Sequence, residues 1–304
     1  MNSPLISLCM PTNGIIDWVF PVLESIYHQG INTELFEIII ADNGDNISFK
    51  NKIKEYLKAH RNIIYIETQA LPFMNEIESY KKASGEMIKF INHRTKLKDR
   101  TLQKFIDYVN QNINSKPITY YSNGVLDISK DIHEYTTFDE FVKNLSYWSS
   151  WSSGMAIWKS DLDKLMKDNI NFNELFPHTD ILFSERHRHK YVIDNSLIFE
   201  EIPQRDKPKG NYDLFFAFGV EYPSIILDLL RSKSISLETY KRIVNENQSF
   251  VASLYYKYIY KKDYCSYDIK GLKNMYGVFY DEKSIKRKIL IMKIKRIMMK
   301  VTKI

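Results

Sequence analysis

The sequence predicts an α/β fold with a mainly parallel sheet and a helical C-terminal extension. From residue 5 to residue 121, short apolar runs typical of strands alternate with amphipathic segments typical of helices. The expected strands cover residues 5–10, 37–41, 63–66, 87–91 and 118–121. Strands separated by helices in this way pair in parallel, and the helices cover both faces of the sheet. Such sheets bind ligands beyond the carboxyl ends of their strands, so the residues that follow each strand are the candidates for a site.

The first expected strand ends in Pro11, Thr12 and Asn13. Proline fixes φ and ends the strand, while the backbone and short polar side chains can reach the edge of a nucleoside base. The same residues also fit an ordinary strand-to-helix turn in which Asn13 caps the helix. The segment therefore predicts either a nucleoside pocket or a simple turn.

The second expected strand ends in Asp42 and Asn43, and the fourth ends in Asn92, His93 and Arg94. Asn43 and the glycine after it form a turn signal, which would make Asp42 a turn residue. Arg94 alone would fit a solvated charge at the end of a strand. Their shared position at the carboxyl ends of strands makes all five residues candidates for ligand contact.

Residues 122–210 are more irregular, and function commonly lies on such segments. Trp148 and Trp151 lie in a Ser-rich stretch typical of a surface loop, where a flat ring can stack on a sugar. Trp158, in an apolar run, is expected in the core. Asp180 lies in the segment LFPHTDILF near a helix start, where it fits either a catalytic carboxylate or a helix cap.

Three segments together resemble the family 2 glycosyltransferases of the GT-A fold: LISLCMPTNG, FEIIIADNGDN and ASGEMIKFINHR. The resemblance covers residues 4–200 and implies a Rossmann-like sheet flanked by helices. It implies an enzyme, a hexosyl- or related sugar transferase, that uses a nucleotide-diphosphate donor, expected to be UDP-linked, and inverts the anomeric centre. The implied acceptor is a saccharide or polyprenyl-linked saccharide in surface polysaccharide assembly, such as capsule, O-antigen or lipooligosaccharide.

The same resemblance gives roles to the candidate residues. Residues 11–13 would line the nucleoside pocket, and Asp42, beside Asn43, would accept the N3 hydrogen of a uracil or thymine ring. Asp180 would be the base that deprotonates the acceptor hydroxyl as it attacks the anomeric carbon. The residues expected on the acceptor side are Trp148, Trp151, Gly154, Met155 and His178. The other candidates for the base are Glu185, Asp161 and His178.

The sequence departs from the family where two metal-binding acids are expected, because Asn92, His93 and Arg94 stand there. The missing carboxylates would hold the divalent cation that neutralises the diphosphate. In one interpretation Arg94, helped by His93 or Lys96, binds the phosphates instead and no cofactor is needed, since guanidinium donors suit phosphate oxygens. In a second, Mn²⁺ or Mg²⁺ still binds through His93, Asn92 and an acid elsewhere. In a third, catalysis is lost and the chain is a sugar-nucleotide or glycan-binding module.

The expected domain organisation has three parts. Residues 1–210 would form the glycosyltransferase domain, with a donor half at about 1–121 and an acceptor half at about 122–210. Residues 211–283 are expected to be helical, with Pro223 breaking or kinking the first helix. Residues 284–304 are expected to form a basic amphipathic tail.

The charge of the chain is uneven. Residues 284–304 contain eight Lys or Arg and no acid, which leaves the other 283 residues at −2 out of the total of +6. This distribution argues against a nucleic-acid-binding surface on the body of the protein. The tail would place its apolar residues on one side, suited to an anionic membrane surface or to packing on the protein itself or on a second subunit. Those apolar residues are Leu290, Ile294, Ile297, Val301 and Ile304.

The cellular location follows from the cysteines and the hydropathy. Cys9 lies in an apolar run far from Cys265, which suits reduced thiols better than a disulfide. The chain has no run of 18 apolar residues that would span a membrane. We therefore expect a cytoplasmic protein held peripherally on the inner face of the cell membrane by its tail.

Overall fold

The structure is a computed structural model that describes residues 3–168, 170–203, 210 and 212–301. The chain divides into two compact units, and each is described by itself. The first unit comprises residues 1–141 and 148–203. The second unit comprises residues 142–147 and 204–304.

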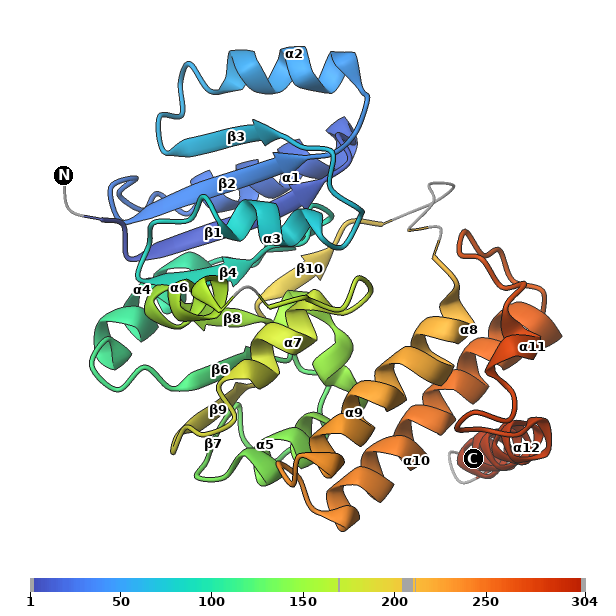
Figure 1. Ribbon diagram of the computed structural model, residues 1–304. Coiled ribbons are helices and arrows are strands. Elements are labelled where there is room, and N and C mark those ends of the chain that lie inside the picture. The colour runs from blue at the N-terminus through green and yellow to red at the C-terminus, as the bar shows by residue number, and fades with distance from the viewer. Residues whose placement is uncertain (1–2, 169, 204–209, 211, 302–304) are drawn as a thin grey trace. The chain divides into compact units, whose positions relative to one another are not determined.

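The first unit is built on a five-stranded sheet in the order β3-β2-β1-β4-β8 (Figure 1). Its strands are β1 (Ile6–Thr12), β2 (Phe36–Asp42), β3 (Ile63–Glu67), β4 (Met87–Phe90) and β8 (Ala156–Trp158). β1 to β4 are parallel, and β8 is antiparallel to β4. The mainly parallel α/β sheet predicted from the sequence is thus confirmed.

Helices cover both faces of this sheet. Successive residues of β1 point to opposite faces, and the apolar side chains on each face are buried against helices. Ile6, Leu8 and Met10 face a core that contains residues of α1 and α4, and Cys9 faces a second core with residues of α3 and α7 (Figure 1). Cys9 is a buried free thiol, as expected. The helices are α1 (Ile16–Tyr27), α2 (Ile47–Tyr56), α3 (Asn75–Tyr80), α4 (Thr101–Asn112), α6 (Lys159–Lys167) and α7 (Pro177–Ser184).

The strand expected at residues 118–121 forms, but it does not join this sheet. β6 (Ile118–Tyr121) pairs in parallel with β9 (Tyr191–Asp194), and β9 pairs antiparallel with β7 (Ile132–Tyr135). The position beside β4 is taken by β8. An apolar run identifies a strand, but its partner is set by contacts distant in sequence, which no local pattern encodes.

Pro11 lies where β1 loses its contact with β4. Cys9 pairs with Phe90, and the Ile91 N–H donates to Cys9 O over 2.8 Å. Proline has no N–H for the next hydrogen bond of the ladder, so the chain can leave the sheet after Ile91. Residues 92–94 form that departure. They lead into a separate antiparallel pair, β5 (Thr95–Leu97) with β10 (Phe199–Glu201).

A helix and two 3₁₀ segments connect the units in sequence. They are α5 (Phe138–Leu145), η1 (Ser146–Ser150) and η2 (Ser152–Gly154). The rest of the second unit is helical. Its elements are α8 (Leu214–Phe216), η3 (Ala217–Glu221), α9 (Tyr222–Arg231), α10 (Leu237–Leu254), η4 (Tyr255–Tyr260), α11 (Leu272–Met275) and α12 (Glu282–Val301).

Pro223 lies in the first turn of α9 and does not break the helical path. The π turn η3 precedes it directly, and the Tyr222 N–H donates to Ala217 O across this widened turn. The Asn247 side chain donates to Phe218 O over 2.7 Å, so a carbonyl of the turn has a partner. A π turn is one of the ways in which a helix accommodates an interruption.

One core holds the second unit together. Phe215, Val251, Met275, Ile285 and Ile289 are all buried in it. In the part of the chain that the structure describes, no helix is long and apolar enough to cross a membrane.

Candidate functional site

The carboxyl ends of β1 and β2 bring two of the predicted donor segments together. Thr12 pairs in register with Asp42, and the Asn43 N–H donates to Thr12 O over 3.0 Å. Gly44 lies so close to Asn13 that a side chain there would overlap the Asn13 backbone. The two turns therefore form one continuous surface, at the edge where parallel sheets bind ligands.

Asn13 does not cap α1. The residue at the cap position is Ile15, and no side chain bonds there. Thr12 instead accepts a hydrogen bond from the Gly14 N–H through Oγ1, over 3.1 Å. The capping alternative is thus wrong, and Asn13 is exposed, with Pro11 half-buried beside it.

Asp42 is the buried acid of this surface, with only 1% of its area exposed. Its Oδ1 accepts from the Gly44 N–H over 2.9 Å, and its Oδ2 accepts from the Tyr65 hydroxyl over 2.8 Å. Burial raises the pKa of Asp42, and these two hydrogen bonds oppose that rise. Each carboxylate oxygen has a second lone pair. Asp42 can therefore accept a further hydrogen bond besides those from Gly44 and Tyr65.

Two asparagine side chains fix these strand ends. Asn75, the first residue of α3, donates to Ala41 O over 2.7 Å and accepts from the Thr68 hydroxyl over 2.6 Å. Asn43 donates to Ala70 O over 3.0 Å. One of the two N–H donors of the Asn43 amide is therefore used within the protein, and the other N–H and the oxygen remain for a ligand.

His93 belongs to the same surface because it bonds to the end of β1. Its Nδ1 lies 2.8 Å from Thr12 Oγ1, and its ring meets the edge of Trp18 at 5.1 Å between centroids. Burial, together with the nearby charge of Arg94, lowers the pKa of His93 to about 3. The ring is therefore neutral at physiological pH and supplies no positive charge for a phosphate.

Asn92 and Arg94 complete the turn. Asn92 Oδ1 accepts from the Arg94 N–H over 3.1 Å, and the Ile202 N–H donates to Arg94 O over 2.9 Å. Both the N–H and the carbonyl oxygen of Arg94 are thus hydrogen-bonded. Its guanidinium has no hydrogen-bond or ion-pair partner within the described residues. Of the three residues that replace the expected acids, only Arg94 presents an available charge.

These residues do not fit a divalent cation. Mg²⁺ and Mn²⁺ prefer carboxylate oxygens, whereas this turn offers one amide oxygen, one imidazole and a cation, and no carboxylate. Within the residues that the structure describes, no group of three or more His, Cys, Asp or Glu side chains is arranged to hold a metal ion.

Asp180 lies in the first turn of α7 and is half-buried. Its Oδ2 accepts from the Asn173 N–H over 2.6 Å, so it closes the loop before the helix and does not cap the helix itself. Burial raises the pKa of Asp180, while the Asn173 hydrogen bond and the charges of His178 and Arg186 oppose that rise. A carboxylate of raised pKa is better suited to accept a proton than an ordinary one.

His178 is buried between Glu76 and Ser150. Its Nδ1 lies 3.2 Å from Glu76 Oε1, and its Nε2 lies 2.9 Å from Ser150 O. Burial lowers the pKa of His178, but the Glu76 carboxylate and the Ser150 carbonyl outweigh it, so the net pKa is raised. Both partners are acceptors, so a doubly protonated ring can donate to each of them and form a buried ion pair with Glu76. The two bonds tie α7 to α3 and to Ser150, and acceptor contact by His178 stays a prediction.

The segment that carries Trp148 and Trp151, residues 148–154, is held in place by Tyr120 of β6. The Tyr120 hydroxyl donates to Trp148 O and to Trp151 O, and a side chain at Gly154 would overlap the Tyr120 ring. Trp148 and Trp151 are half-buried and meet edge to face at 6.3 Å. Gly154 and Met155 are buried and pack within the unit, and their contact with an acceptor stays a prediction. Trp158 lies in the core, as expected.

The other candidate bases are held in an ion-pair cluster. Arg188 pairs with Asp161 through Nη2 and with Glu185 through Nε, the latter over 3.1 Å. Their charges are compensated within the protein, which leaves Asp180 as the best placed acid on this side.

Sequence reasoning missed two buried charges. Glu76 is 2% exposed, and no pattern links it to His178, which lies 102 positions away. Lys89 is fully buried in β4, and its Nζ donates to the carbonyls of Phe90, Ser153 and Met155. Burial lowers the pKa of Lys89. A lysine inside an apolar strand was the available signal, because lysine is almost never buried without partners.

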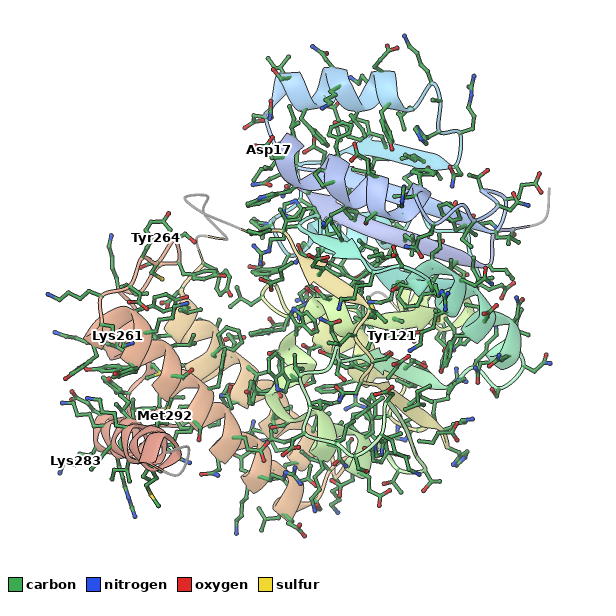
Figure 2. All side chains as sticks on the ribbon, turned by 180° about the vertical axis from the view of Figure 1, so that it is seen from behind. Asp17, Tyr121, Lys261, Tyr264, Lys283 and Met292 are labelled. Atoms are coloured by element: carbon green, nitrogen blue, oxygen red, sulfur yellow. The ribbon has the colours of Figure 1, made fainter. Side chains whose placement is uncertain are left out.

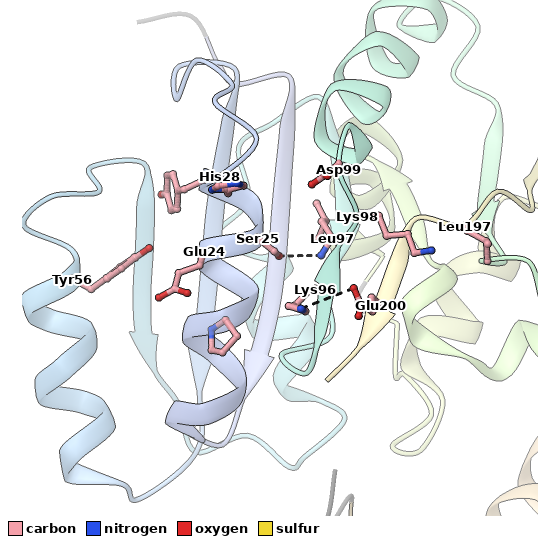
Figure 3. Close-up of a pocket in the computed structure, with 12 residues that line it drawn as sticks. Glu24, Ser25, His28, Tyr56, Lys96, Leu97, Lys98, Asp99, Leu197 and Glu200 are labelled. Carbon is pink, nitrogen blue, oxygen red and sulfur yellow. Dashed lines mark hydrogen bonds and ion pairs between the residues drawn. The ribbon is translucent and has the colours of Figure 1, made fainter. Parts of the chain in front are cut away.

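A groove of about 1070 Å³ lies along α1, and its lining includes Lys96 but none of residues 11–13, 42, 43 and 92–94 (Figure 3). Glu24 and His28 of α1 line one side, and the β5–β10 pair lines the other. The Ser25 hydroxyl bonds to the Leu97 N–H over 3.0 Å, and Lys96 pairs with Glu200 over 4.0 Å (Figure 3). Lys96 therefore lines this groove and already has an anionic partner.

Comparison with known proteins identifies the fold. No family model matches the chain, and no curated protein matches it. It matches the crystal structure of S. aureus TarS 1–349 with a TM-score of 0.59 at 13% identity, over 83% of this chain and 74% of that one. TarS 1–349 in complex with UDP-GlcNAc matches with a TM-score of 0.56 at 14% identity, over 84% and 72%. The chain has the GT-A glycosyltransferase fold.

Proposed function

We propose that the protein is a glycosyltransferase that moves a sugar from a UDP-linked donor to a saccharide or lipid-linked saccharide in surface polysaccharide biosynthesis. The observation that supports this most is the continuous surface of residues 11–13 and Asp42, with the available Arg94 guanidinium at the next strand end. The structures of TarS with UDP-GlcNAc and with UDP have the same fold, which supports a UDP-linked donor.

On the donor side, different residues would contact the nucleoside and the phosphates of the nucleotide. Asp42 accepts the N3 hydrogen of the base with a free lone pair, and the backbone and side chain of Asn13 contact the nucleoside. Arg94 donates to the phosphate oxygens and stabilises the charge that develops on the leaving diphosphate. Arg94 thus performs the electrostatic work of a cation without a metal ion.

The acceptor side would supply the base. Asp180 takes the proton from the acceptor hydroxyl as its oxygen attacks the anomeric carbon from the side opposite the diphosphate, which inverts that centre. Trp148 and Trp151 contact the faces of the acceptor sugar. The Glu76–His178 ion pair holds α7, and therefore Asp180, in place.

The test of the donor proposal is the affinity of Arg94→Ala for UDP and for uridine, measured by isothermal titration calorimetry. We expect UDP binding to weaken by about 10- to 100-fold, the value of one charge-assisted hydrogen bond, while uridine binding stays unchanged. Arg61, an exposed arginine in the same unit, provides the matched control Arg61→Ala. Transfer should also persist in EDTA. Equal UDP affinity in both variants, or loss of transfer in EDTA, would refute the role of Arg94.

A second candidate function is a catalytically inactive module that binds a sugar nucleotide or a glycan. The observation that favours it is the bond between Asp180 and the Asn173 N–H, which gives the carboxylate a structural use. UDP binding that is lost in Arg94→Ala, together with no turnover of any donor in a panel, would support this alternative over the transferase.

A further inference from the structure

The second unit carries most of the positive charge of the protein. Residues 142–147 and 204–304 contain 22 Lys or Arg and 10 Asp or Glu, a formal net charge of +12. The first unit is acidic, at −6. Residues 284–304 contribute +8 of this charge, and the rest of the second unit contributes +4. A unit with this charge attracts anionic surfaces.

α12 has two apolar faces on opposite sides. Ile285 and Ile289 are buried, and Met292 packs against the same core. Leu290 and Ile294 are 58% and 47% exposed. At 3.6 residues per turn, Leu290 and Ile294 lie about half a turn around the helix from Ile285 and Ile289. The helix packs on its own unit with one face and presents the other to solvent.

This arrangement revises the expectation of a simple amphipathic tail. The packing that the sequence left as an alternative does occur, through residues outside the predicted stripe. Leu290 and Ile294, the part of the stripe that the structure describes, remain exposed. The side chains of Ile297 and Val301, and the whole of Ile304, lie outside the described residues.

Basic side chains lie beside the exposed face. Lys283 and Arg287 are exposed and lie on the same side as Leu290, two turns and one turn before it. Lys293, on the flank, has its Nζ 4.0 Å from the ring centroid of Tyr260. Figure 2 shows Lys283 on this unit together with Lys261 and Tyr264, which are also exposed. Aliphatic side chains bordered by cations are typical of a helix that lies in the headgroup region of an anionic bilayer.

We propose that the second unit docks on an anionic lipid bilayer through this face of α12. Leu290, Ile291 and Ile294 insert at the boundary between headgroups and acyl chains, and Lys283 and Arg287 face the lipid phosphates. A second copy is a poorer occupant because two units of charge +12 repel each other. A soluble polyanion is also poorer because it offers the aliphatic side chains nothing to bury against.

The test is sedimentation of the full chain with phosphatidylcholine vesicles that contain either no phosphatidylglycerol or 30% of it. We expect partitioning only with the anionic vesicles. Leu290→Ser/Ile294→Ser should lower the partition coefficient at least tenfold because two buried aliphatic groups are lost. Lys283→Gln/Arg287→Gln should lower it by about 25-fold, about fivefold for each charge. All four side chains are exposed, so these variants should fold as the unaltered chain does.

The control is Ile47→Ser/Leu71→Ser, which removes two aliphatic side chains that are 72% and 54% exposed on the first unit. This variant should partition like the unaltered chain. An equal loss in the control, equal binding to neutral vesicles, or no effect of the α12 variants would overturn the proposal. So would a dimer in sedimentation velocity that Leu290→Ser/Ile294→Ser abolishes, or polyphosphate binding in place of vesicle binding.

Discussion

The buried ion pair between Glu76 and His178 should contribute strongly to the stability of the first unit. At the 3.2 Å between His178 Nδ1 and Glu76 Oε1, the Coulomb attraction is about 5 kcal/mol at an effective dielectric constant of about 20. Removing one partner of such a pair leaves an uncompensated charge and costs about 3 to 5 kcal/mol. Glu76→Gln keeps an oxygen acceptor but not the charge. We therefore expect a loss of about 3 kcal/mol in the free energy of unfolding.

The same pair predicts a pH dependence of known sign. The folded-state pKa of His178 lies above the ordinary value of 6.5, so its stabilisation is fully present below that value. It is lost as the pH rises from about 6.5 through the raised pKa of the folded state. The unaltered chain should become less stable across this window, and Glu76→Gln should flatten the profile.

Urea unfolding followed by tryptophan fluorescence measures this effect, because all four tryptophans belong to the first unit. The control is Glu78→Gln in the same helix, which breaks an exposed ion pair with Lys81 and should cost less than about 0.5 kcal/mol. If Glu76→Gln costs no more than Glu78→Gln, or leaves the pH profile unchanged, the assignment of a doubly protonated His178 is wrong.

Two further substitutions probe the acceptor side. Asp180→Asn should reduce transfer by at least 100-fold with little change in UDP affinity, and Glu174→Gln, in the exposed loop nearby, should leave transfer unchanged. Because burial raises the pKa of Asp180, the acid limb of the rate profile should lie above the ordinary value of 3.8, and an unshifted limb would exclude Asp180 as the base. Gly154→Ala should destabilise the first unit by about 1 to 3 kcal/mol, because the new methyl group overlaps the Tyr120 ring. Thermal unfolding measures this loss, and an unchanged midpoint would show that the segment of residues 148–154 is not held in place as described.

The edge formed by the ends of β1 and β2 was predictable because it depends on local rules. Apolar runs located β1, β2 and β4, and the geometry of parallel strands then placed Thr12 beside Asp42. The expectation that Pro11 ends its strand was wrong, because β1 continues to Thr12 and only its pairing with β4 ends near Pro11. These inferences need only the neighbours of each residue in sequence.

The acceptor side was less predictable because it depends on distant contacts. Nothing in the sequence around His178 reveals that both ring nitrogens are occupied by Glu76 and Ser150. The three residues of β8 are too few to show a period, so its place beside β4 could not be inferred. Lys89 was visible as an anomaly, but its three carbonyl partners come mostly from a segment 64 to 66 positions away.

The first turn of α3 connects the two halves of the candidate site through adjacent residues. Asn75 holds the end of β2 through Ala41 O, and Glu76 holds α7 through His178. Under the proposed function, a nucleotide that displaced the strand end would therefore also act, one residue later, on the helix that carries Asp180. Linkage would make such coupling reciprocal, so an acceptor that moved α7 would alter donor affinity by the same factor. Cooperativity between two substrates would here require no hinge, only the stiffness of a single helical turn.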